Sequence, residues 1–238
     1  MNLAILRSLT LAILLPLAIV ACSGPPDGLA GRFAWYDYVS GQDMQRTCSR
    51  STLERYRVVF NAEYTKQVRT YDILQKRDGA TLRGRVFRGS LTSDASFSSA
   101  VGGLIGRTGQ LPLNAAGFAA FKQAVAGAEP YLAGEPVYLR SDSYFWVVLE
   151  CRGGRVLARA FTGPRDHLER LPFRRILLAN DPTGVPVRVQ RPLPADQLSG
   201  FGRAYSLMES ETTERAEGDA GPLFQFRFEN GRIGILGG

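Results

Sequence analysis

Arginines are the side chains with the clearest chemical potential in this 238-residue chain. Only three of its 29 basic residues are lysines, and its formal net charge is +7. A planar guanidinium group can bind both oxygens of a carboxylate or phosphate, which an ammonium group does not do. Five arginines fall on neighbouring predicted strands and are candidates for one face that binds an anionic ligand: Arg57, Arg69, Arg83, Arg85 and Arg88. The alternative is that arginine is simply the preferred cation here, with its charges scattered and solvated.

Residues for covalent or acid–base catalysis form no recognisable set. The one histidine, His167, follows Asp166 directly, and a sequence neighbour is badly placed to orient it as in a catalytic triad. The glycine-rich stretch 102–108 lacks both the spacing and the lysine of a phosphate-binding loop. Acidic pairs that would serve a glycosidase carry no defining motif. We therefore expect no catalytic residues and no cofactor, and no metal site, because one remote histidine offers no ligand cluster.

The first 22 residues have the organisation of an export signal. One early cation, Arg7, is followed by an uncharged apolar run from Leu9 to Ala21, which is short for a membrane-spanning helix. The run ends in Ile19-Val20-Ala21-Cys22, where a branched aliphatic residue and two further residues precede a cysteine. This ending resembles the lipobox of bacterial lipoproteins.

The resemblance implies both an anchor and a location. In that family the signal peptide, here residues 1–21, is removed, and the cysteine, here Cys22, receives lipid on its thiol and its new amine. Several buried acyl chains at ~0.8 kcal/mol per methylene would anchor the protein stably. Ser23 replaces the Asp that often retains such proteins at the inner membrane, so the outer membrane facing the periplasm is expected. Residues 22–31 would form a lipidated tether. The alternative is an uncleaved anchor, or an ordinary signal with a chance cysteine.

Two cysteines, Cys48 and Cys151, remain once Cys22 is assigned to the lipid by that resemblance. An exported domain meets an oxidising compartment, where an even remainder favours a disulfide. Closing a loop of about 100 residues would contribute about 4–5 kcal/mol. The alternative is a pair of free, buried thiols.

Alternation of apolar and polar residues predicts strands over much of the remaining chain. In Glu54–Phe60, Arg55 and Arg57 alternate with apolar residues, which predicts a half-buried strand with a cationic outer face. Segments 63–74 and 81–87 are expected as antiparallel partners, joined by a turn at Asp78-Gly79. Residues 144–149 are apolar on both faces, which predicts a central strand, and 155–161 should return after Gly153-Gly154.

Two further elements have local signals. Asn230-Gly231 predicts a type I′ turn that pairs Phe228 with Ile233, Phe226 with Ile235 and Glu229 with Arg232. Asn114 can cap a helix over 115–126 that ends at Gly127. Segment 90–110 is expected as a long loop, 166–170 as a helical turn, and 209–219 as an acidic loop.

Composition and pattern together predict one β-rich domain over residues 32–238. The hydrophobic fraction of 45% and the charged fraction of 21% exclude disordered, collagen-like and polytopic membrane proteins. The fold class is mainly antiparallel β (β-rich α+β), as one sheet or a sandwich, with a single well-marked helix near 114–127. Near the anchor, an aromatic cluster is a candidate contact surface or the first strand of the sheet: Trp35, Tyr36 and Tyr38.

These observations favour a non-catalytic binding or assembly module, anchored in the outer membrane by Cys22. Its partner would be an envelope protein or an anionic envelope lipid or glycan. Nucleic acid fits the charge but not the compartment. Two alternatives remain open: a periplasmic hydrolase or transferase acting on glycan or lipid, and a carrier of an apolar ligand.

Overall fold

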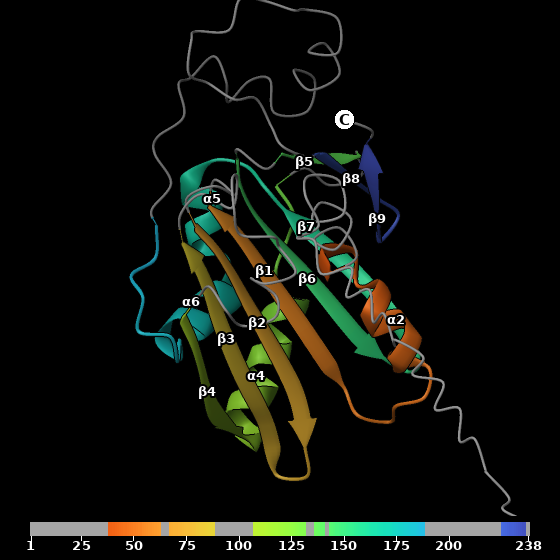
Figure 1. Ribbon diagram of the computed structural model, residues 1–238, viewed down its shortest axis with the longest axis vertical. Helices are drawn as coiled ribbons and strands as arrows, with labels where there is room; N and C mark the ends of the chain where they lie inside the picture. The colour runs from red at the N-terminus through yellow and green to blue at the C-terminus, as the bar shows by residue number, and fades with distance from the viewer. Residues whose placement is uncertain are drawn as a thin grey trace, which may run out of the picture.

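Two antiparallel sheets form the framework of the protein (Figure 1). The computed structural model describes residues 38–62, 67–88, 107–131, 136–140, 143–188 and 225–236. The larger sheet has six strands in the order β4-β3-β2-β1-β6-β7, and the smaller has the order β5-β8-β9. The predicted β-rich α+β class is confirmed.

In the larger sheet, β1 pairs along its whole length with β2 on one side and with β6 on the other. Residues 144–151 of β6 are all buried, which confirms the prediction of a central strand covered on both faces. The strand bounds are β1 (Arg55–Ala62), β2 (Gln67–Lys76), β3 (Gly79–Arg88), β4 (Arg107–Asn114), β6 (Tyr144–Arg152) and β7 (Arg155–Phe161).

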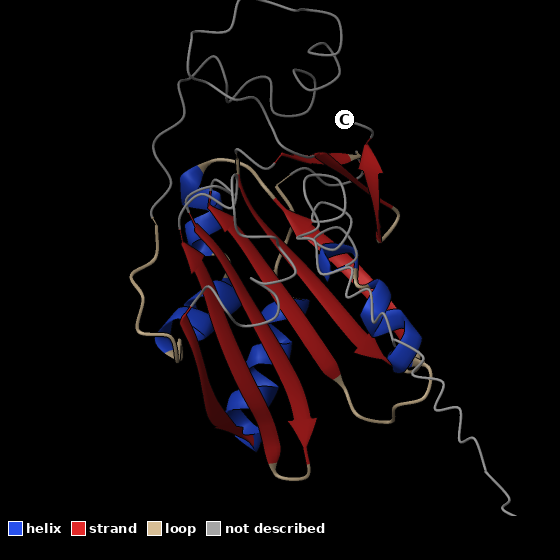
Figure 2. Ribbon diagram, in the orientation of Figure 1, coloured by secondary structure: helices blue, strands red, loops and turns tan. Residues whose placement is uncertain are grey.

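The sheet separates two apolar cores, because alternate residues of each strand point to opposite faces. Thus Val58 packs under α4 (Ala115–Ala126), α5 (Arg165–Arg170) and α6 (Pro172–Ala179). Its neighbour Val59 packs under α2 (Gln42–Cys48) and the smaller sheet, which consists of β5 (Val137–Arg140), β8 (Gln225–Glu229) and β9 (Arg232–Leu236). Figure 2 shows α4 running along one face of the strands.

Elements with local sequence signals are confirmed. The Asn114 side chain accepts a hydrogen bond from the Gly117 N–H at 2.8 Å, and α4 ends before Gly127 as predicted. The residues Asn230 and Gly231 have φ angles of 51° and 71°, as a type I′ turn requires. The register of β8 and β9 pairs Phe228 with Ile233, as expected, and likewise Phe226 with Ile235 and Glu229 with Arg232.

Cys48 and Cys151 form the predicted disulfide, with their Cα atoms 5.7 Å apart. Cys48 is the last residue of α2, and Cys151 lies near the end of β6. The bond therefore fixes α2 to the central part of the larger sheet.

Other expectations were wrong at particular positions. The turn between β2 and β3 is Arg77-Asp78, because Gly79 already pairs with Lys76 in the ladder. Residues 107–110, expected in a loop, belong to β4. The helix near 114–127 is accompanied by α2, α5 and α6, of which only α5 is expected from the sequence, as a helical turn. The expected segments 90–106 and 209–219 lie outside the described residues.

The cationic outer face predicted for β1 is also wrong. Arg57 is only 2% exposed, and from Tyr56 to Ala62 every residue of β1 is buried. The face expected to meet solvent is covered by α2 and the residues before it.

Candidate functional site

Arg57 is a structural residue that joins α2 to the sheet. Its two terminal nitrogens each donate to one carboxylate oxygen of Asp43, both at 2.7 Å, and its Nε donates to Asp72 at 3.2 Å. The ring of Tyr38 lies 3.7 Å from its guanidinium carbon, a cation–π contact. Burial by itself would lower the pKa of Arg57, but the hydrogen bonds to Asp43 and the negative charges of Asp43 and Asp72 together raise it above its usual value, so the group stays charged. Its charge is neutralised within the protein.

Arg69 is also buried and paired, at 0% exposure. It forms an ion pair with Asp181 and donates a hydrogen bond to the Val185 carbonyl oxygen. The segment carrying these partners reaches the sheet because Gly84 and Gly109, opposite each other on β3 and β4, leave room for Pro182. A Cβ on Gly109 would lie 2.0 Å from the Pro182 carbonyl oxygen.

The five arginines of the predicted anion-binding face do not lie together on one side of the sheet. Asp72 lies opposite both Arg57 and Arg83, which therefore share a face. Arg85, two residues further along β3, shares that face too, whereas strand alternation places Arg69 on the opposite face. Arg83 is exposed and donates to Gln110 at 3.4 Å. Arg88 ends β3, and its side chain lies outside the described residues, as do Trp35 and Tyr36.

His167 packs against an aromatic ring. The rings of His167 and Tyr131 lie 5.3 Å apart, and burial lowers the pKa of His167. The neighbouring Asp166 is paired with Arg170 at 2.9 Å and so is engaged on the surface of α5. Among the residues that the structure describes, no three His, Cys, Asp or Glu side chains are grouped as a metal site would need.

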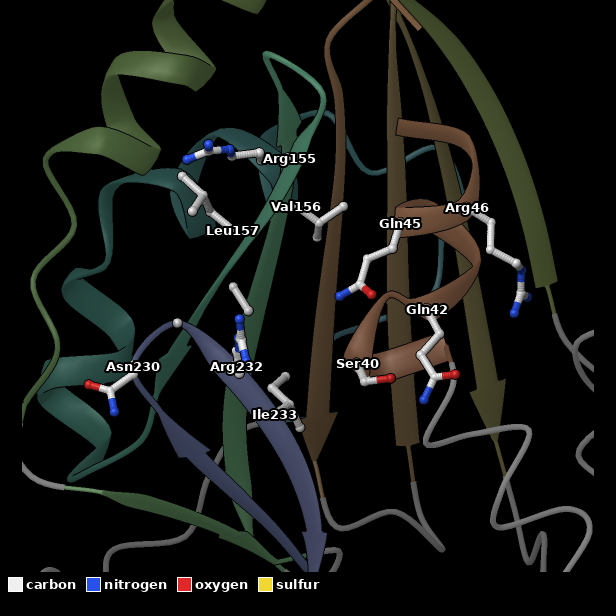
Figure 3. Close-up of a pocket in the computed structure, with 12 residues that line it drawn as sticks. Ser40, Gln42, Gln45, Arg46, Arg155, Val156, Leu157, Asn230, Arg232 and Ile233 are labelled. Carbon is white, nitrogen blue, oxygen red and sulfur yellow. The ribbon is translucent and has the colours of Figure 1, made fainter. Parts of the chain in front are cut away.

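A large open cleft lies instead beside the edge of the larger sheet, with a volume of about 910 Å³. Three parts of the chain that are far apart in sequence form it: α2, the first half of β7, and the turn between β8 and β9 (Figure 3). We call it the α2–β7 cleft, and its lining residues are Ser40, Gln42, Gln45, Arg46, Arg155, Val156, Leu157, Ala158, Asn230, Gly231, Arg232 and Ile233.

The charge of the α2–β7 cleft is entirely positive. Each of its three walls contributes one exposed arginine, namely Arg46, Arg155 and Arg232, and no lining residue is acidic. Unlike Arg57 and Arg69, none of the three forms an ion pair with another residue in the described part of the chain. Two glutamines and Asn230 add amide donors and acceptors. The cleft can therefore accept carboxylate or phosphate groups.

The walls of the cleft are held in place by specific bonds. On α2, Asp43 binds the buried Arg57, and Cys48 is bonded to Cys151. On the other side, the Ala158 N–H donates to the Gly231 carbonyl oxygen at 3.3 Å and ties β7 to the β8–β9 turn. A preorganised cleft loses less conformational entropy when a ligand binds.

The three guanidinium groups surround the cleft rather than converge on one point. In Figure 3, Gln45 and Val156 point toward one another across the gap between α2 and β7. Arg155 points away from α2 on the other side of β7, and Arg46 extends from the far side of α2. This arrangement suits a ligand that carries several separated acidic groups.

Sequence reasoning missed this cleft, although one signal was available. Arg155 and Arg232 each stand directly after a two-residue turn with positive φ angles, at Gly153-Gly154 and at Asn230-Gly231. Both turns are predicted from the sequence, but nothing local indicates that the arginines after them lie near each other and near α2.

Comparisons with known proteins give no match: no protein-family model, curated protein or solved structure resembles the chain significantly. Among the described helices, none is both long and apolar enough to cross a membrane.

Proposed function

We propose that this protein is a non-catalytic binding module of the bacterial cell envelope. Cys22 carries its lipid anchor, at the outer membrane facing the periplasm, and the α2–β7 cleft binds an acidic partner. The observation that carries this proposal is the set of three exposed arginines without counter-ions in the described chain, around a cleft that no acidic residue lines.

The contrast between two kinds of arginine supports the proposal. Arg57 and Arg69 are buried and each is neutralised by aspartate, so they stabilise the fold. The cleft arginines are exposed and unneutralised within the described chain, so an acidic ligand would supply their counter-ions. Because guanidinium groups recognise carboxylate and phosphate through paired hydrogen bonds, the expected ligand class is anionic.

Binding of an acidic polymer tests the role of the cleft. The probe is fluorescently labelled poly-L-glutamate, and the affected variant combines Arg46→Gln, Arg155→Gln and Arg232→Gln. Exposed ion pairs contribute up to ~1 kcal/mol each, so the triple variant should bind about 10- to 100-fold more weakly.

The matched control removes the same charge near the opposite edge of the larger sheet, through Arg77→Gln in the turn before β3, Arg83→Gln on β3 and Arg107→Gln on β4. These three residues are also exposed. Equal weakening in both triple variants would show that net charge alone attracts the probe, and would refute the role of the cleft.

The anchor has a separate test. Cells expressing the full chain are labelled with radioactive palmitate and fractionated. The Cys22→Ala variant should lose the label and leave the membrane fraction, whereas the wild-type chain should keep both. Unlabelled wild-type protein would contradict the proposed lipidation.

A further inference from the structure

One strand edge runs along the α2–β7 cleft. β7 is the last strand of the larger sheet, and four of its residues, 155–158, line the cleft. Edge strands present backbone N–H and C=O groups that can pair with another chain. The cleft therefore combines a charged lining with a template for strand pairing.

The direction of these backbone groups follows from the hairpin register. Arg155 pairs with Arg152 across the two-residue turn, so the next residue, Val156, directs its N–H and C=O groups away from β6. The backbone N–H of Ala158 also points away from β6, because it donates a hydrogen bond to the Gly231 carbonyl oxygen. Within the described chain, the N–H and C=O groups of Val156 have no hydrogen-bond partner.

The side chains around this edge suit an extended ligand. Leu157 is 52% exposed and shares one side of β7 with Arg155, whereas Val156 points to the opposite side, toward α2. An added strand would also direct its alternate side chains to these two sides. Acidic side chains on one side of such a strand would meet Arg155, and side chains on the other side would face Gln45 of α2.

We propose that the α2–β7 cleft binds an extended, acidic polypeptide segment of another protein, which adds to the sheet as a short strand beside β7. This inference rests on the proposed function and makes it more specific, because a glycan or lipid has no peptide backbone to pair. Main-chain hydrogen bonds to Val156 would supply affinity, and the spread arginines would select acidic side chains.

The test compares three synthetic decapeptides of alternating Glu and Thr, capped at both ends, for binding to the full chain in detergent. The first is unmodified, the second has N-methyl groups on its six central residues, and the third has Gln in place of Glu. The protein is the same in every measurement, so failure to fold cannot cause a difference.

The N-methylated peptide should bind about 10-fold or more weakly than the unmodified one, because it keeps its charge but loses its backbone donors. In addition, hydrogen exchange at the Val156 amide should slow about 10-fold or more when the unmodified peptide saturates the protein.

The outcomes separate the two proposals. Equal affinity for the N-methylated peptide, with unchanged exchange at Val156, would overturn strand addition but leave the proposed binding of anions by the cleft intact. Equal affinity for the Gln peptide would overturn the proposed function itself. Polygalacturonate is acidic but has no peptide backbone. If it slowed hydrogen exchange at the Val156 amide as strongly as the unmodified peptide, strand addition would be overturned.

Discussion

The ion pair between Arg69 and Asp181 offers a direct test of how the buried arginines are held. In an Asp181→Asn variant, the Arg69 guanidinium would remain buried without its carboxylate partner. Removing one member of a buried ion pair costs about 3–5 kcal/mol, because the remaining charge has neither water nor a counter-ion. Arg69 keeps its hydrogen bond to the Val185 carbonyl oxygen, so we expect the lower end of that range, about 3 kcal/mol.

Urea unfolding of the mature chain, followed by circular dichroism, measures this loss. The control is Asp166→Asn, which breaks an exposed ion pair with Arg170 and should barely move the midpoint. If both variants shifted the midpoint by the same small amount, the dependence of Arg69 on its buried counter-ion would be refuted.

A second substitution separates lost charge pairing from lost packing. Arg69→Met in the Asp181→Asn background removes the stranded charge and keeps an unbranched apolar side chain. Because apolar replacement of a buried pair is often close to neutral, the double variant should recover most of the lost stability. Additive losses from the two substitutions would contradict the coupling.

Three further predictions concern other parts of the fold. Replacing both Cys48 and Cys151 with Ser opens a loop of 103 residues and should lower the free energy of unfolding by about 4–5 kcal/mol, measured by urea unfolding without reductant. Asn114→Ala removes the cap of α4 and should cost about 1 kcal/mol, whereas Asn114→Ser should retain most of it. Burial lowers the pKa of His167, so near pH 6 the unfolded chain binds more protons than the folded one. The free energy of unfolding should therefore fall as the pH drops through 6.5. Urea titrations at several pH values should show a weaker pH dependence for His167→Gln.

The parts of the fold that were predicted from the sequence depend on neighbouring residues. The Asn230-Gly231 turn forms because both positions need positive φ, and the register of β8 and β9 follows from it. Asn114 caps α4 through a bond to a residue three positions away. In both cases the determining contacts lie within the element itself.

The burial of Arg57 and Arg69 could not be predicted in the same way. Their neutralising carboxylates, Asp43 and Asp181, lie 14 and 112 positions away in the sequence. An arginine that alternates with apolar residues has the pattern of a solvent-exposed position on a half-buried strand. Only the tertiary structure shows that a carboxylate from a distant segment pairs with it. The expected anion-binding face therefore loses two of its five arginines to the interior.

The α2–β7 cleft was missed for a related reason. Its first wall, α2, buries only Met44 and Cys48, which gives too short an apolar pattern to predict a helix. The other walls are hairpin ends that are joined by a backbone hydrogen bond from Ala158 to Gly231. The site arises from tertiary packing of three segments that are each unremarkable in sequence.

In the proposed function, the α2–β7 cleft holds an acidic polypeptide in the cell envelope. Photo-crosslinking in intact cells tests it, with a photoreactive residue at Gln45 inside the cleft or, as control, at the exposed Gln110 on β4. We predict that position 45 crosslinks to one envelope protein, at a segment rich in Asp and Glu, and that the Arg155→Gln and Arg232→Gln substitutions abolish this product. The same product from position 110, or an unchanged yield without these arginines, would contradict the account.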